Sequence, residues 1–207
     1  MKILFAHVAH SAGVSNWYQE IADNAPANLQ VDCFCVTLFP PGPRLDWIDL
    51  DRRWRQKERS LLKMYAQLRE IAVDYDVLLL YNGANIHPEF LQYLTTFNIY
   101  CCFDDPESSD ELSAPVAHAF DAVFYGNIAS RFQYEHWGCK KIAWLPIFTA
   151  PSDLPNKEAG DLLLSTPRSE DICLIGEKNL FRKRRLEMLS TAFPNAKCFG
   201  KGWPNGR

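Results

Sequence analysis

Two adjacent carboxylates, Asp104 and Asp105, directly follow an uncharged run, Phe97–Phe103. A short apolar run of this kind is typical of a strand buried on both faces, as in a parallel sheet. Pro106 cannot donate to a strand ladder and favours an extended or turn conformation before it, so the predicted strand ends at the acids. Open α/β sheets bind ligands at this end of their strands, where a carboxylate can take a proton from a hydroxyl group. The alternative is that both acids only cap and close a turn, which is a common use of aspartate.

A glycine turn followed by a basic helix is the second candidate site. Gly176 follows a predicted strand, Asp171–Ile175, and precedes a predicted helix, Phe181–Ala192. The amino end of that helix carries four consecutive cations, Arg182, Lys183, Arg184 and Arg185. Free backbone amides, the positive end of the helix dipole and guanidinium groups together suit a phosphate. A solvated basic helix face is the alternative reading.

Two further polar loops follow predicted strands. His7 and His10 lie in the first, where a histidine can serve as acid or base or contact a sugar hydroxyl. A metal pair is disfavoured there, because a strand end offers no helical face and no third ligand is close in sequence. Asn82 and Asn85 lie in the second loop and could hydrogen-bond a polyhydroxylated acceptor.

Other chemistries find little support in the sequence. The basic run Arg52–Arg59 could hold an anionic acceptor such as nucleic acid, but its interspersed acids favour a solvated helix face. Acyl transfer lacks a nucleophile elbow. The aspartate pair does not fit a phospho-accepting receiver domain, because it follows the fourth predicted strand rather than the first.

Composition indicates a well-packed globular protein, and we expect it to need no cofactor. The chain has 207 residues, of which 47% are hydrophobic, and a formal net charge of −3, so no general basic field favours nucleic acid. Its seven cysteines show no CxxC spacing and several lie in apolar runs, which favours reduced thiols in a cytoplasmic protein over disulfides or a zinc site. The sequence shows neither a signal-peptide pattern nor an apolar stretch of membrane-spanning length.

Strand and helix patterns alternate along the chain, which predicts a doubly wound parallel Rossmann-like α/β sheet. Strands are predicted at Lys2–Val8, Leu29–Phe39, Asp76–Tyr81, Phe97–Phe103, Asp121–Tyr125 and Lys141–Leu145. Helices are predicted at Asn16–Ala25, Trp47–Ala72, Pro88–Thr95, Leu112–Ala119 and Ile128–Trp137. We therefore assign residues 1–150 to an amino-terminal domain, 151–169 to a linker rich in proline and polar residues, and 170–207 to the beginning of a second Rossmann-like domain.

Six segments, in this order, resemble the CgeB-like (spore-maturation type) family of GT-B glycosyltransferases. They are Asp76–Leu80, Phe103–Pro106, Phe120–Phe124, Trp137–Lys141 with Trp144–Pro146, Asp171–Gly176 with Arg184 and Arg185, and Phe199–Trp203. The resemblance covers most of the chain from about residue 76 onward. It implies two Rossmann-like domains that face a cleft, with the acceptor on the amino-terminal domain and a nucleotide-activated sugar on the other. Transfer in such folds is generally metal-independent.

The resemblance assigns roles to particular residues. Gly176, Arg184 and Arg185 match the donor-side motif, and Asp104 with Asp105 matches the acidic turn that faces the cleft. The residues from Asp171 to Arg207 are fewer than the family's second domain needs, and its later acidic donor-binding segment is missing. The sequence therefore predicts a glycosyltransferase, possibly truncated, whose donor is a nucleotide-diphosphate sugar and whose acceptor is unknown. The alternative is a non-catalytic acceptor-binding or scaffold domain derived from such an enzyme.

Overall fold

The computed structural model divides the chain into two compact units, Met1–Asp153 and Leu154–Arg207. It describes residues 1–8, 12–36, 45–81, 85–146, 156–165, 167, 172–176, 178 and 180–204, without the side chains of residues 12–17, 163, 164 and 181. His10 and Asn82, both predicted to be site residues, lie outside the described residues.

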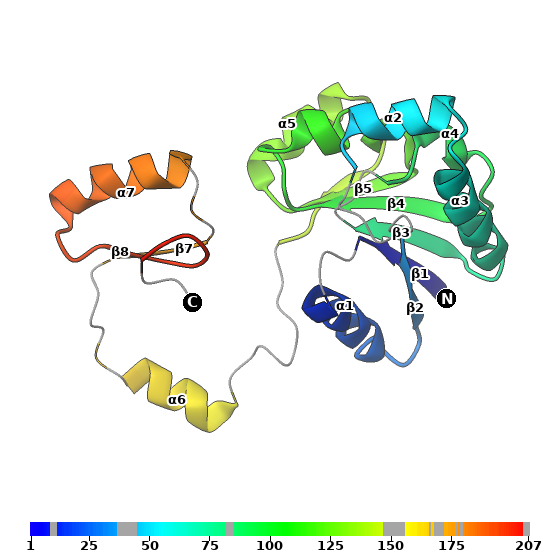
Figure 1. Ribbon diagram of the computed structural model, residues 1–207. Helices are drawn as coiled ribbons and strands as arrows, with labels where there is room; N and C mark the ends of the chain where they lie inside the picture. The colour runs from blue at the N-terminus through cyan, green and yellow to red at the C-terminus, as the bar shows by residue number, and fades with distance from the viewer. Residues whose placement is uncertain are drawn as a thin grey trace. The chain divides into compact units, whose positions relative to one another are not determined.

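Unit 1 contains a six-stranded parallel sheet in the order β2-β1-β3-β4-β5-β6 (Figure 1). Its strands are β1 (Lys2–His7), β2 (Gln30–Cys35), β3 (Val77–Tyr81), β4 (Phe97–Cys102), β5 (Ala122–Tyr125) and β6 (Ile142–Trp144). All neighbouring strands pair in parallel. The predicted Rossmann-like α/β fold class is confirmed.

Side chains alternate between the two faces of this sheet, as the pleat of a strand requires. One face carries Leu4, Leu80 and Tyr100, which are at most 1% exposed. It is covered by α2 (Trp47–Arg55), α3 (Arg59–Ala72), α4 (Pro88–Leu91) and α5 (Arg131–His136), whereas α1 (Ala12–Asp23) lies on the opposite face (Figure 1). Phe5, His7 and Tyr81 point to the α1 side, because they alternate with the residues of the first face.

The sequence predicted one helix over Trp47–Ala72, but the structure has two helices there. The prediction of a continuous helix was therefore wrong. Helix α2 ends at Arg55 and α3 begins at Arg59, and between them Lys57 has a left-handed backbone with φ of 53°. The side chain of Arg53 pairs with Glu58 across this break, with an Nη1–Oε1 distance of 2.7 Å. A continuous apolar stripe therefore does not require a continuous helix, because a local turn can return the chain to the same face.

Two other predicted helices are shorter or irregular. Helix α4 stops at Leu91 instead of reaching Thr95. The segment from Leu112 to Ala119 forms a π-helical turn, η1 (Ser109–Ser113), and a 3₁₀ turn, η2 (Ala117–Ala119). Pro115 lies between them and lacks the amide that a continuous α-helix would need. Another 3₁₀ turn, η3 (Ile128–Ser130), precedes α5.

Unit 2 contains a two-stranded parallel sheet. Strand β7 (Cys173–Ile175) pairs with β8 (Lys197–Phe199), and α7 (Leu180–Ala192) connects them. Helix α6 (Lys157–Ser165) forms within the segment for which the sequence predicts a linker. None of the helices among the described residues is long and apolar enough to cross a membrane.

Candidate functional site

The strand order changes direction between β1 and β3. Strand β1 leads to β2 on one side, and the chain then returns to place β3 on the other side of β1. Open α/β sheets bind ligands at the carboxyl ends of strands at such a switch point, because the connecting loops diverge there. His7 and Tyr81 are the last residues of these two strands and are direct partners in the ladder.

Aromatic side chains and one carboxylate gather at this point. We call the group His7, Tyr18, Tyr81, Phe103 and Asp104 the switch-point cluster. The ring of Tyr18 lies 4.2 Å from that of His7 and 5.3 Å from that of Tyr81, measured between centroids. The ring of Phe103 lies 5.4 Å from that of Tyr81. Packing of this kind holds both strand-terminal side chains in place.

His7 is a buried histidine with an unused hydrogen-bonding atom. Its side chain is 4% exposed, and its Nδ1 has no hydrogen-bond partner in the part of the chain that the structure describes. Burial lowers the pKa of His7 to about 4, because the charged imidazolium is poorly solvated. The ring is therefore neutral at pH 7 and can donate a hydrogen bond or accept one.

Asp104 is the half-buried member of the acid pair. Burial raises the pKa of Tyr81, and the negative charges of neighbouring groups, Asp104 among them, raise it further. The phenol consequently stays protonated near neutral pH and can donate a hydrogen bond. An ionisable carboxylate and two neutral polar rings therefore share one end of the sheet.

Asp105 has a different environment, and we do not retain it as a catalytic residue. It is 2% exposed, and one carboxylate oxygen accepts a hydrogen bond from Ser109 Oγ at 3.1 Å. Its other oxygen accepts a hydrogen bond from the hydroxyl of Tyr134, a residue of α5. Both oxygens are used within the protein, so Asp105 ties the turn after β4 to α5, as the turn-closing alternative expects for this residue.

This tie predicts a measurable loss of stability. Tyr134→Phe removes one of the two hydrogen bonds to a buried carboxylate and should lower the free energy of unfolding by about 2 kcal/mol, since hydrogen bonds to charged groups contribute about 1.5–3 kcal/mol. Urea denaturation at pH 7 measures the change. Tyr93→Phe is the matched control, because Tyr93 is 54% exposed and its hydroxyl should matter little. Equal stability of the two variants would contradict the assignment of Asp105 as a structural tie.

Asn85 is likewise withdrawn as an acceptor contact. It is fully buried, with 0% exposure. Its Nδ2 donates to the carbonyl of Val36 at 2.7 Å, and its Oδ1 accepts from the amide of Leu45 at 2.9 Å. The side chain therefore holds the end of β2 to the segment before α2, and both of its polar atoms are used within the protein.

A cavity adjoins the switch-point cluster on the α1 side of the sheet. It has a volume of about 370 Å³ and shares Tyr81 with the cluster. Phe5, whose ring centroid lies 5.8 Å from that of Tyr81, also lines it. The rest of its lining is largely apolar and includes Ile21, Leu79, Cys101 and Phe124. The cavity therefore provides space for an apolar group beside Tyr81.

Unit 2 brings two glycine turns together. Gly176 follows β7 with φ of +147°, and Gly200 follows β8 with φ of +119°, both in the region that favours glycine. A Cβ atom on Gly200 would lie 2.6 Å from the carbonyl oxygen of Gly176, so a side chain has no room there. That same oxygen accepts a hydrogen bond from Trp203 Nε1 at 3.0 Å. Gly200 and Trp203 were not among the predicted site residues. The Gly-Lys-Gly-Trp sequence that contains them could have indicated this second glycine turn.

Arg182 is the predicted donor-side cation that lies closest to this turn. A Cβ atom on Gly176 would lie 2.9 Å from Arg182 Nη1, so the glycine allows the guanidinium to approach the backbone. Arg184 and Arg185 are exposed on the same helix. The ammonium group of Lys178 lies 5.4 Å from the centre of the Trp203 ring. Cations and close backbone thus meet at the carboxyl ends of β7 and β8, an arrangement that suits a phosphate.

No group of three potential metal ligands occurs among the described residues. His7 lies at the switch point, and its suggested partner His10 falls outside the described ranges.

No family model matches this chain, and no curated protein sequence matches it. A similar fold occurs in a sucrose-phosphate synthase from Thermosynechococcus elongatus, with a TM-score of 0.52 and 11% sequence identity over 98% of this chain and 71% of that one. Arabidopsis thaliana UGT89C1, solved in complex with quercetin, gives a TM-score of 0.45 and 10% identity over 99% of this chain and 68% of that one. At 11% identity, the first similarity concerns the fold alone.

Proposed function

We propose that this protein is a glycosyltransferase of the GT-B type, which moves a sugar from a nucleotide-diphosphate donor to an acceptor hydroxyl. The observation that carries the proposal is the position of Asp104, a half-buried carboxylate just beyond the carboxyl end of β4. Its negative charge is one of those that raise the pKa of Tyr81 at the switch point. The fold similarity to a sucrose-phosphate synthase supports it. Membership of the CgeB-like family remains part of this proposal.

In the proposed reaction, Asp104 takes the proton of the acceptor hydroxyl as its oxygen attacks the anomeric carbon of the donor. The bond from that carbon to the diphosphate breaks, and the diphosphate leaves with the electron pair. Neutral His7 and the Tyr81 phenol, which are partners in the strand ladder, would hydrogen-bond the acceptor, and the cavity beside Tyr81 would hold an apolar part of it. Arg182, with Arg184 and Arg185, would stabilise the negative charge that develops on the diphosphate. No step requires a metal ion.

A cytoplasmic location is also proposed. None of the seven cysteines forms a disulfide bond. Burial raises the pKa of both Cys101 and Cys102 to about 12, which keeps them protonated and unreactive. Buried, protonated thiols such as these, in a structure without disulfide bonds, agree with a reducing compartment.

Donor binding predicts stabilisation by nucleotide diphosphates. At a concentration of about 100 times its Kd, uridine or thymidine diphosphate should raise the free energy of unfolding by about 2.7 kcal/mol, which corresponds to about 5–10 °C in Tm for a chain of this size. Replacing Arg182, Arg184 and Arg185 together by alanine should remove the shift. Thermal unfolding followed by circular dichroism measures it.

Arg59→Ala is the control, because Arg59 is an exposed cation on α3 of unit 1. This variant should keep the shift. If a panel of nucleotide diphosphates leaves the Tm of the unaltered chain unchanged, the donor assignment is wrong. Slow release of free sugar from a nucleotide sugar then distinguishes an enzyme from a binding domain, since hydrolysis needs no acceptor.

A further inference from the structure

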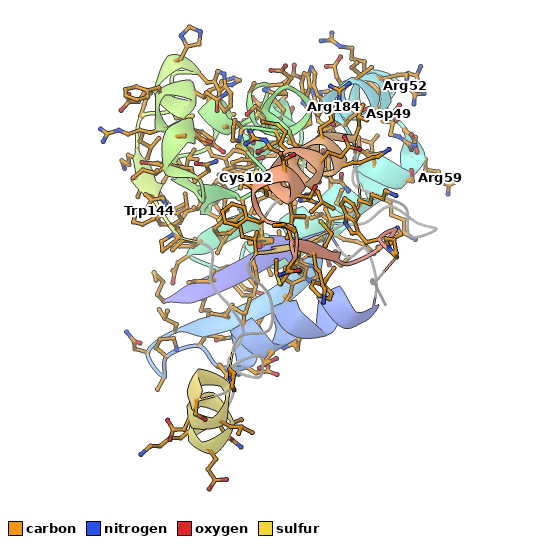
Figure 2. All side chains as sticks on the ribbon, turned by 90° about the vertical axis from the view of Figure 1, so that its left-hand side faces the viewer. Asp49, Arg52, Arg59, Cys102, Trp144 and Arg184 are labelled. Atoms are coloured by element: carbon orange, nitrogen blue, oxygen red, sulfur yellow. The ribbon has the colours of Figure 1, made fainter. Side chains whose placement is uncertain are left out.

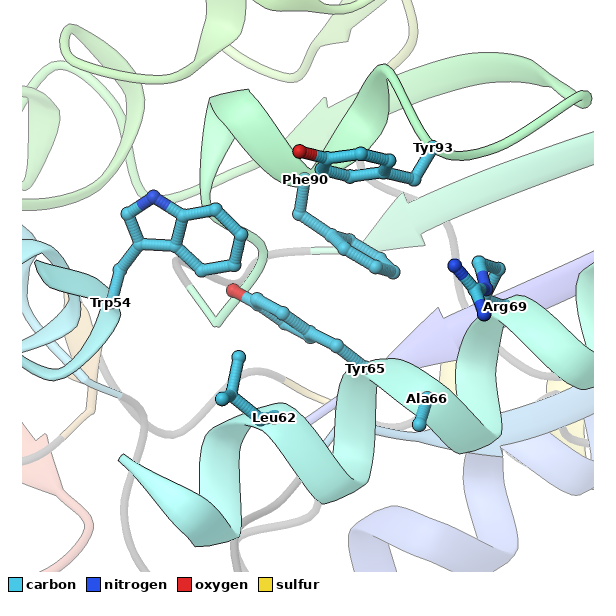
Figure 3. A pocket seen from close by; sticks show the side chains of 7 residues that line it. All are labelled: Trp54, Leu62, Tyr65, Ala66, Arg69, Phe90 and Tyr93. Atoms are coloured by element: carbon cyan, nitrogen blue, oxygen red, sulfur yellow. The ribbon is translucent and has the colours of Figure 1, made fainter. Parts of the chain in front are cut away.

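An aromatic groove lies between helices α2, α3 and α4, and it shares no residue with the switch-point cluster (Figure 3). It has a volume of about 280 Å³ and is lined by Trp54, Leu62, Tyr65, Ala66, Arg69, Phe90 and Tyr93. A second hollow of about 540 Å³ shares Trp54, Leu62 and Tyr93 with it, so the two are continuous. We call the combined feature the aromatic groove.

The floor of the groove is rigid. The rings of Tyr65 and Phe90 stack with centroids 4.1 Å apart and an interplanar angle of 14°. The Tyr65 hydroxyl donates to the carbonyl of Asn85 at 3.0 Å and accepts from the amide of His87 at 2.7 Å. The indole of Trp54 stacks on the His87 ring at 5.0 Å. A ligand would therefore meet a surface that needs little ordering on binding, which favours affinity.

Its rim exposes apolar and aromatic groups. Tyr93 is 54% exposed and Leu62 is 39% exposed. Trp54 is half-buried, and its Nε1 donates to Glu89 Oε2 at 2.8 Å, which fixes the plane of the indole at one end of the groove. Figure 3 shows the indole of Trp54 and the side chain of Arg69 at opposite ends, with the rings of Phe90 and Tyr93 between them. Rings held open to solvent in a hollow mark a binding surface.

The charges around the groove do not suit a polyanion. The basic run before α3 is largely neutralised, because Arg52 pairs with Asp49 on the surface of α2 (Figure 2) and Arg53 pairs with Glu58. Arg55 Nε lies 2.7 Å from Asp51 Oδ2. These pairs support the solvated-face reading of the run. Two cations remain on the groove, Lys57 and Arg69, and neither forms an ion pair within the described ranges.

We propose that the aromatic groove binds an oligosaccharide. The C–H bonds on one face of a pyranose ring carry partial positive charge and are attracted to the negative face of an aromatic ring. Arg69, Lys57 and the Tyr93 hydroxyl can donate hydrogen bonds to ring oxygens and hydroxyls, and Glu89 can accept from a hydroxyl. A nucleic-acid strand carries a charge on every unit and would face Glu89 with only two unpaired cations to neutralise it. The inference goes beyond sugar transfer, because it concerns a surface that holds a carbohydrate chain whether or not the protein is catalytic.

The test is a binding experiment on the whole chain without any donor. Maltohexaose, cellohexaose, xylohexaose (all uncharged) and a six-residue oligothymidylate are titrated separately and followed by isothermal calorimetry. We expect at least one hexasaccharide to bind with a Kd of about 1 mM or tighter, and the oligothymidylate to bind more weakly than it. Tyr93→Ala should weaken that binding at least about tenfold, because it removes the most exposed ring of the groove.

Phe132→Ala is the matched control, since Phe132 is an exposed aromatic residue of α5, with 77% exposure, outside the groove. It should leave binding unchanged. Ala66→Trp provides a second variant that fills the groove without removing a packed ring, and it should abolish binding. The inference is overturned if no hexasaccharide binds at about 10 mM, if the oligothymidylate binds most tightly, or if Tyr93→Ala and Ala66→Trp both bind as the unaltered chain does. None of these outcomes depends on nucleotide diphosphates, so the donor assignment stands or fails separately.

Discussion

Asp104→Asn is expected to lower the rate of sugar transfer about 10²–10⁴-fold, the usual contribution of a positioned general base. Asparagine has nearly the same shape as aspartate but cannot take a proton from the acceptor hydroxyl. The loss should appear in kcat, because the proton moves in the transition state while the acceptor can still bind. A transfer assay with the acceptor found by screening measures it, and protection by nucleotide diphosphates should be unchanged.

Two neighbouring acids supply the controls. Glu107→Gln neutralises an exposed carboxylate in the same turn and should keep transfer within about twofold. Asp105→Asn disturbs the hydrogen bonds to Ser109 and Tyr134, so we expect it to lower stability more than Asp104→Asn does. If Asp104→Asn transfers sugar at the rate of the unaltered chain, Asp104 is not the base. The position of Asp104 then no longer supports the proposed function.

The strands and their carboxyl ends could be predicted from sequence because the signals are local. Runs such as Phe97–Phe103 and Asp76–Tyr81 are short, apolar and bounded by polar residues, and the structure places β4 and β3 within them. The end of β1 at His7 follows in the same way from the apolar run before it. Alternation of strands with helices then leaves a parallel sheet as the natural arrangement.

The switch point could not be predicted in the same way, because it depends on the order of strands across the sheet. Nothing in the sequence near His7 indicates that β3 pairs with β1 over the whole of its length. Tyr18 and Tyr81 were missed for this reason, since their importance comes from packing on His7 and near Asp104. Polarity alone was a weak guide to ligand contacts in loops. Asn85 uses its amide to join two backbone segments inside the protein.

The two aspartates show how far a sequence motif can be read. Asp104 and Asp105 are identical in type and adjacent in position, so pattern reasoning treats them as a pair. Their difference arises from Tyr134, which reaches Asp105 from a helix that begins 26 residues later. Distant partners of this kind determine whether a carboxylate is available to a substrate, and only the folded chain reveals them.

His7 predicts a large dependence of stability on pH. Its pKa is about 4 in the folded protein and 6.5 in the unfolded chain, so the unfolded state binds more protons between these values. The stability that comes from burying the neutral ring is fully present above pH 6.5 and is lost as the pH falls through this range. The difference in pKa corresponds to a loss of about 3 kcal/mol by pH 4.

Replacing His7 by phenylalanine should remove this part of the pH dependence, because phenylalanine does not titrate and can occupy the aromatic cluster. We expect the free energy of unfolding of His7→Phe to fall by about 3 kcal/mol less than that of the unaltered chain between pH 7 and pH 4, measured by urea denaturation at each pH. Carboxylates and His87 titrate equally in both proteins, so the difference isolates His7. Tyr81→Phe alters the same cluster without removing a group that titrates in this range, and it should keep the full loss. If the curves of His7→Phe and the unaltered chain run parallel, the His7 ring is accessible to protons in the folded state and the switch point is more open than its packing indicates.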